Sequence, residues 1–100
     1  MKLNVYSMFD NKVDVFNIPI VEKDEANVIE NIKRVSEDFK EYGVNPADYE
    51  LYELGEYETT TGKFNLLDSP KHLFSVNQIV AHKEMTEAIA NKDKEEKWKV

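Results

Sequence analysis

The sequence predicts an α+β fold, in which a small antiparallel sheet of about four strands packs against one amphipathic helix and a second helix follows toward the C-terminus. Two segments, residues 3–16 and 49–67, alternate apolar with polar side chains on either side of turn sequences, as hairpins do. Between them, residues 24–42 repeat apolar side chains at helical spacing. One hundred residues can bury a single core without disulfides. We therefore expect one domain over residues 1–90 and a charged, mobile tail over residues 91–100.

The first hairpin is predicted from residues 3–16. Residues 3–9 have one fully apolar face and one mixed face, which is typical of a strand in a small sheet. An Asp-Asn-Lys sequence at positions 10–12 supplies turn residues before a second strand that ends at Phe16. Pro19 has no main-chain N–H to donate, so it marks the end of the hairpin or a sheet edge.

The helix over residues 24–42 is the strongest local signal in the chain. Asp24 is a suitable N-cap, and Glu25 places a negative charge in the first turn, where it complements the helix dipole. Gly43 stands where a left-handed C-terminal cap is expected, and the following Asn-Pro pair prevents continuation. The apolar stripe recurs at steps of four, three, four and three residues and consists of Val28, Ile32, Val35, Phe39 and Tyr42.

The second hairpin is predicted from a strand that begins near residue 49. Gly55 interrupts this strand, which often indicates a bulge. A Thr-Thr-Gly-Lys turn at positions 60–63 leads into a return strand over residues 64–67. The residues expected on one face of the first strand are Tyr49, Leu51 and Tyr57, and those on the other are Tyr52 and Leu54.

The second helix is predicted after a break at the Ser69-Pro70 pair. Ser75 and Gln78 have the spacing of a capping box, which places a helix start just after Ser75. Apolar residues then continue to about Ala90, where we expect the helix to end.

The composition gives little support for an enzyme or a metal site. The chain has no cysteine, and its two histidines, His72 and His82, do not have a zinc-binding spacing. No G-x-S-x-G sequence or glycine-rich phosphate loop is present, and the alternating glutamates of residues 50–58 indicate a solvated face. We expect no enzymatic activity, no catalytic residue, no metal and no cofactor. Because no apolar run is long enough to span a bilayer and residues 1–10 lack a signal-peptide core, we expect no membrane association and no export.

Single-stranded nucleic acid is one candidate partner, because aromatic side chains on a sheet can stack on bases while lysines follow the backbone. The formal net charge of −7 opposes such binding, since phosphate contacts depend on Lys and Arg. Tyrosines in strands are also frequent core or interface residues, and the tail is equally consistent with a solubilising end. The candidate contacts are the tyrosines Tyr6, Tyr52 and Tyr57, the lysines Lys2, Lys12, Lys63 and Lys71, and Lys97 and Trp98 in the tail.

Another protein chain is the alternative partner. Both faces of the strand over residues 49–57 carry apolar side chains, and a single helix can cover only one of them. The second face needs a cover, supplied by the C-terminal segment or by a partner chain. We expect a homodimer, with Tyr52 and Leu54 as the candidate interface residues.

Several sequence stretches form a distinctive set when taken together. They are YSMFD near the N-terminus, the later Pro19, the segment NPADYELYELGEYETTTGKF and the stretch SPKHLF. Together, over residues 5 to about 75, they resemble the small nonstructural protein of gokushovirus-type single-stranded DNA phages of the Microviridae. The most distinctive part is the hairpin over residues 45–62.

That resemblance implies a role without catalysis. It implies a nonstructural accessory protein, proposed to bind single-stranded DNA and to assist viral genome synthesis or packaging. It also implies that the protein acts in the cytoplasm of the infected bacterium and is absent from the mature virion. The alternative, based on the apolar faces of the sheet, is a dimeric interaction module that engages a phage or host protein and does not bind DNA.

Overall fold

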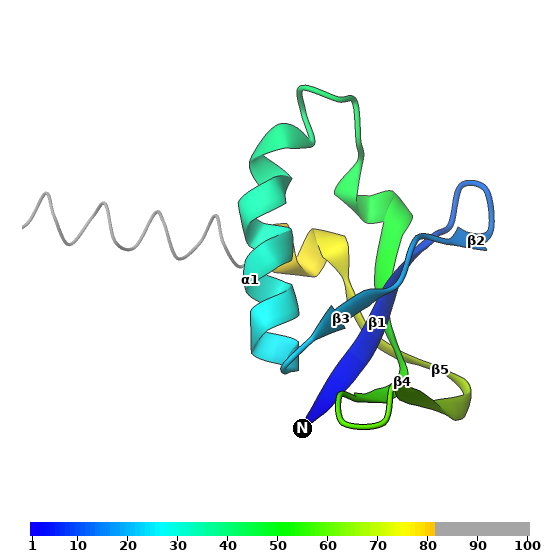
Figure 1. The fold of residues 1–100 in the computed structure, drawn as a ribbon. Coiled ribbons are helices and arrows are strands. Elements are labelled where there is room, and N and C mark those ends of the chain that lie inside the picture. Colours follow the sequence, from blue (N-terminus) through cyan, green and yellow to red (C-terminus); the bar gives the residue numbers. More distant parts are fainter. Residues whose placement is uncertain (82–100) are drawn as a thin grey trace, which may run out of the picture.

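The computed structural model describes residues 1–81 and shows a curled antiparallel sheet with helices on one side (Figure 1). The predicted α+β class is confirmed. The expected continuation of the C-terminal helix to Ala90 and the charged tail lie outside the described residues. The elements in chain order are β1 (Lys2–Asp10), β2 (Val15–Phe16), β3 (Ile20–Glu22), α1 (Glu25–Val35), the 3₁₀ turns η1 (Ser36–Asp38) and η2 (Pro46–Asp48), β4 (Tyr49–Glu58), β5 (Lys63–Ser75) and helical residues 76–81.

The sheet has the strand order β2-β1-β4-β5, and β3 pairs with β1 on the same side as β2. The first predicted hairpin is confirmed, because β1 pairs antiparallel with β2. Pro19 does not end the pairing, however. The chain returns to β1 directly after it, where Val21 of β3 lies opposite Val5. The sequence did not predict this strand, since three residues are too few for a periodic signal.

Helix α1 begins where the sequence predicts and ends earlier. The Asp24 side chain accepts a hydrogen bond from the Asn27 main-chain N–H at 2.9 Å, which confirms the N-cap. The expected extension to Tyr42 is wrong, since the α-helix stops at Val35 and Tyr42 is 75% exposed. At that point the Ser36 hydroxyl donates to the Lys33 carbonyl at 2.6 Å, a local bond that competes with further helix. The left-handed conformation predicted for Gly43 is confirmed by its φ of 67°.

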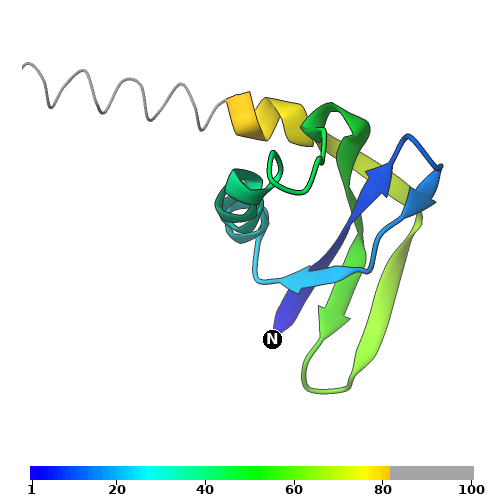
Figure 2. The same cartoon turned by 90° about the horizontal axis from the view of Figure 1, so that it is seen from above.

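The core lies between α1 and one side of the sheet. Tyr6 of β1 and Leu51 of β4 pack with Val28 and Ile32 of α1, and all four are buried. Figure 2 shows α1 and residues 76–81 together on this side of the strands. We call it the helix face and call the opposite side of the sheet the open face.

Residues 76–81 complete the cover of the helix face. The Gln78 side chain accepts a hydrogen bond from the Ser75 N–H at 3.1 Å, and the Ser75 hydroxyl accepts one from the Asn77 N–H at 3.2 Å. The predicted capping-box start is therefore confirmed. Val76 and Ile79 enter the core directly after this cap, so the cap fixes where the chain leaves the sheet.

A one-residue bulge divides β4 into two parts. Glu53 pairs with Tyr6 and Gly55 pairs with Val5, so Leu54 between them has no partner on β1. Such an insertion reverses which side chains point to each face. Tyr57 consequently lies on the open face, and the expectation that it shares a face with Leu51 is wrong. The bulge predicted from Gly55 is confirmed.

Strand β5 is longer than the sequence predicts. The break expected at Ser69-Pro70 is wrong, because β5 continues from Lys63 to Ser75. Pairing with β4 is irregular there: Leu66 lies opposite Gly55, and the next paired residue is Lys71, opposite Glu53. Pro70 is tolerated because β5 is the last strand in the order, where a missing N–H leaves no neighbouring strand unpaired.

Gly55 permits the close contact between β4 and β5. Its φ is 153°, and a Cβ built there would collide with the carbonyl oxygen of Asn65 and lie 2.7 Å from Leu66 Cα. We expect Gly55→Ala to lower the free energy of unfolding by about 2 kcal/mol or more, measured by urea denaturation. Gly43→Ala is the matched control, because Gly43 also has a positive φ but has open space around it. An equal loss in the two variants would show that the contact with β5 is unimportant.

Candidate functional site

The open face carries a cluster of four rings. The Phe9 ring lies 4.8 Å from that of Phe16 on β2 and 6.1 Å from that of Tyr52 on β4, measured between centroids. Tyr52 also contacts Phe16 at 5.4 Å and His72 of β5 at 5.3 Å, both edge to face. The rings thus join four strands across the sheet. Edge-to-face pairs of this kind stabilise a sheet, so the cluster has a structural role whatever else it contacts.

Beside this ring cluster, the open face exposes aliphatic and aromatic surface. Tyr57 packs on Phe64 with their centroids 4.8 Å apart, and Phe64 remains 58% exposed. Leu66, opposite Gly55, is 61% exposed. On the same face, Phe16 of β2 and Val21 of β3, at the edge of the sheet opposite β5, are also exposed. In the described part of the chain no helix covers this face, which is the arrangement of an interaction surface.

A buried hydroxyl ties the β2–β3 connection to the open face. Ser7 is fully buried, and its hydroxyl donates a 2.7 Å hydrogen bond to the Asn17 carbonyl. The Asn17 N–H donates in turn to the Met8 carbonyl at 2.8 Å. These bonds hold the connection against β1 while the next side chain, Ile18, is 87% exposed.

The predicted cationic contacts lie away from the rings. Lys2 and Lys63 both stand opposite Glu58, and Lys71 stands opposite Glu53, which are positions on the helix face. The Lys2 ammonium lies 3.9 Å from the Glu56 carboxylate. Within residues 1–81, the strand registers place neither lysine nor arginine on the open face. Lys12 is exposed in the β1–β2 turn, beyond the ladders.

The predicted tyrosines have different surroundings. Tyr6 is 1% exposed within the core, so no base can stack on it, and its prediction as a nucleic-acid contact is wrong. Burial, opposed by a hydrogen bond from Asn4, raises the pKa of the Tyr6 hydroxyl. Tyr52 and Tyr57 are on the open face, as stacking would require. Leu54, predicted with Tyr52 as a dimer contact, is the unpaired bulge residue.

Two of the predicted contacts are not among the described residues, and the sequence analysis missed three aromatic residues of the open face. Lys97 and Trp98 lie outside the described residues. Sequence reasoning missed Phe9, Phe16 and Phe64 as companions of Tyr52 and Tyr57. Alternation could have placed Phe9 on a face, but strand register is needed to bring the rings together.

The far end of the β4–β5 hairpin is held by an ionised carboxylate. Glu58 accepts hydrogen bonds from the Met1 ammonium at 2.8 Å and from the N–H and hydroxyl of Thr60. These bonds lower the pKa of the Glu58 carboxyl to about 2. Glu58 is therefore negative at neutral pH and adds to the acidic character of the helix face at this end.

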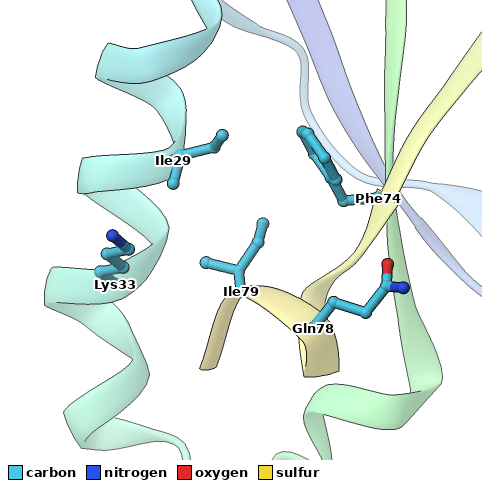
Figure 3. Close-up of a pocket in the computed structure, with 5 residues that line it drawn as sticks. All are labelled: Ile29, Lys33, Phe74, Gln78 and Ile79. Atoms are coloured by element: carbon cyan, nitrogen blue, oxygen red, sulfur yellow. The ribbon is translucent and has the colours of Figure 1, made fainter. Parts of the chain in front are cut away.

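A separate hollow lies where α1 approaches the start of residues 76–81. It has a volume of about 290 Å³ and is lined mainly by carbon (Figure 3). Ile29 and Phe74 point toward each other across it, and Ile79 lies between them. Lys33 and Gln78 stand at its rim. Among the described residues, no group of His, Asp and Glu side chains is arranged to hold a metal ion.

Comparison with known proteins identifies the family of this chain. The family described as Phage ORF5 protein matches residues 3–79, which contain α1 and, apart from Lys2 at the start of β1, the strands that the structure describes. The chain belongs to the phage ORF5 protein family. No curated protein and no solved structure matches the chain. No helix in the described residues of this phage ORF5 protein is long and apolar enough to cross a membrane.

Loss of the Ser7 hydroxyl tests how the open face is held together. We expect Ser7→Ala to destabilise the fold by about 1 kcal/mol, because the buried bond to Asn17 is lost. Hydrogen exchange measured by NMR should become faster at the Asn17 amide, which depends on that connection. Ser36→Ala is the control, since it removes a hydroxyl bond at the end of α1. Unchanged exchange at Asn17 in Ser7→Ala would contradict this assignment.

Proposed function

We propose that this phage ORF5 protein is a non-enzymatic accessory protein that acts by binding another protein through its open face. In keeping with the resemblance to gokushovirus-type phages, it would act in the cytoplasm of the infected bacterium during genome synthesis or packaging and be absent from the mature virion. The observation that carries the proposal is the exposed apolar surface of Phe16, Val21, Phe64 and Leu66, on a sheet face that no helix of residues 1–81 covers.

The distribution of charge favours a protein partner over DNA. Affinity for single strands depends strongly on cations that contact phosphates, and the strand registers put Lys2, Lys63 and Lys71 opposite carboxylates on the other face. The charged group beside the rings is Glu50, 3.2 Å from His72. An apolar centre poor in cations is typical of protein interfaces.

A phage carrying a substitution at Leu66 tests this function. Leu66→Glu places a charge on an exposed position, so the protein should fold while its open face loses apolar character. We expect phage yield per infected cell to fall by about tenfold or more, because a charge within an apolar interface must be desolvated. Tyr42→Glu, at an exposed position beyond α1, is the matched control and should leave the yield unchanged.

The protein level and circular dichroism of both variants show whether the fold is kept. A normal yield from phage carrying folded Leu66→Glu would reject the open face as the working surface. Equal losses in both variants would show that the effect does not belong to this face.

Direct binding of single-stranded DNA is the second candidate function, favoured by one observation. Tyr52 and His72, with Phe9 and Phe16, form an aromatic group on a sheet face, and aromatic groups on sheets stack bases. Two facts oppose DNA binding: these rings already contact one another, and the chain is acidic.

Fluorescence anisotropy of a labelled single-stranded oligonucleotide tests DNA binding. If the lysines and the tail contact phosphates, saturable binding should appear and weaken steeply between about 50 mM and about 200 mM salt. Tyr52→Ala should weaken binding, whereas Tyr42→Ala should not, since Tyr42 is exposed beyond α1 and does not belong to the ring cluster of Phe9, Phe16, Tyr52 and His72. Absence of binding at both salt concentrations would reject the DNA-binding function and leave protein binding.

A further inference from the structure

The outer edge of β5 is the longest unpaired strand edge in the described part of the chain. β5 pairs with β4 on one side, and no described strand pairs with its other side. Residues 63–72 are all exposed. Unpaired N–H and C=O groups along such an edge can receive a strand from another chain. Phe64 and Leu66 add exposed apolar side chains at this edge, on the open face.

The regular part of β5 is suited to pairing with itself. Phe64 and Leu66 are two residues apart, opposite Tyr57 and Gly55 of β4, so both lie on the same face. An antiparallel pair of identical strands with a two-fold axis at Asn65 therefore sets Phe64 of one copy opposite Leu66 of the other, twice. The same register puts Lys63 opposite Leu67, away from the apolar pairs, because Lys63 lies on the helix face opposite Glu58.

We propose that two copies of this chain pair their β5 strands antiparallel about a two-fold axis at Asn65, forming one sheet that continues through the dimer. This inference rests on the proposed function, because it names a second copy as the protein that the open face and its edge receive. Both open faces then lie on the same side of the joined sheet, and the apolar surface at Phe64 and Leu66 becomes continuous across the axis.

The fold explains why such pairing closes at two copies. The contact uses the same strand in each copy, so both β5 edges are paired in the dimer and neither is left to bind a third copy. The opposite side of the sheet is not an equivalent edge, because β2 and β3 are strands of two and three residues that cover β1. Pro70 and the irregular pairing between Leu66 and Lys71 confine the contact to the first part of β5.

Charge gives the dimer a distinct dependence on salt. Each copy carries a formal charge of −7, so two copies repel each other at long range. The interface itself is made of main-chain hydrogen bonds and apolar side chains. Screening of the repulsion should therefore strengthen the dimer as salt rises, which is opposite to the behaviour of DNA binding.

Sedimentation equilibrium of the full chain tests the dimer. We expect a species of twice the 11.7 kDa chain mass that becomes more stable between about 50 mM and about 200 mM salt. Leu66→Lys should weaken the dimer by about tenfold or more, because the two-fold axis makes each substitution count twice. Ile18→Lys changes an exposed apolar residue in the β2–β3 connection, at the other edge of the sheet, and should have no effect.

A cysteine at the axis tests the register. The chain contains no cysteine, so Asn65→Cys introduces one thiol per copy. Residues directly opposite in an antiparallel pair have Cα atoms about 4.5 to 5.5 Å apart, within disulfide range. Mild oxidation should give a covalent dimer at protein concentrations near the dissociation constant. Asn11→Cys, exposed in the β1–β2 turn, should give little.

A monomer at every concentration up to about 1 mM would overturn the dimer. Equal weakening by Leu66→Lys and Ile18→Lys, or equal cross-linking of the two cysteine variants, would overturn the β5 interface. A monomer combined with a low phage yield for Leu66→Glu would keep the proposed function with a different protein as partner. A β5 dimer combined with a normal yield would reject that function while keeping the dimer.

Discussion

The bulge at Leu54 and Gly55 is the constraint on which both faces of this protein depend. β4 pairs with β1 on one side and with β5 on the other, so an extra residue in it reverses the side-chain direction between the part of the strand before the bulge and the part after it. Before the bulge, Leu51 points into the core. After it, Tyr57 points to the open face, and Glu56 and Glu58 lie on the helix face. Gly55 makes this possible because any other side chain would meet the main chain of β5.

This reversal separates the apolar and charged parts of the hairpin. Tyr52 lies on the open face before the bulge, and the reversal adds Tyr57, which packs on Phe64, whereas the carboxylates beyond the bulge face Lys2 and Lys63. In the described strands, the ring cluster and the lysines therefore lie on opposite faces of the sheet. A surface that binds single-stranded DNA combines aromatic rings and cations on one face. The bulge therefore makes this sheet less suited to binding DNA and better suited to binding a protein.

Local chemistry made much of the fold predictable. The cap at Asp24, the Ser75 and Gln78 pair and the positive φ of Gly43 each depend on residues within a few positions of one another. The end of α1 was not predictable in this way, because the apolar stripe continues to Tyr42 and the sheet beneath it does not. The spacing of apolar residues shows which side of a helix is apolar, but it does not show how far the sheet beneath that helix extends.

The candidate surface was less predictable for the same physical reason. Tyr52 was identified from its strand, but its neighbours Phe16 and His72 come from strands far apart in the sequence and meet through register. β3 gave no periodic signal, and the bulge reversed the face of Tyr57. Tyr6 was predicted as an exposed contact and is buried, because the sequence of a strand does not show whether a tyrosine faces solvent or a helix.

The open face and the β5 edge form one feature of the structure. Leu66 lies opposite Gly55, so the glycine that permits the bulge also lets Leu66 reach the open face at the outermost strand. A partner strand along β5 would satisfy the free main-chain groups and cover Phe64 and Leu66 in the same step. Within residues 1–81, β2 and β3 protect the other edge of the sheet and Pro70 protects the later part of β5, whereas the apolar part of β5 has no such protection. Because edges without a function are usually blocked, this selective exposure argues that the edge is used.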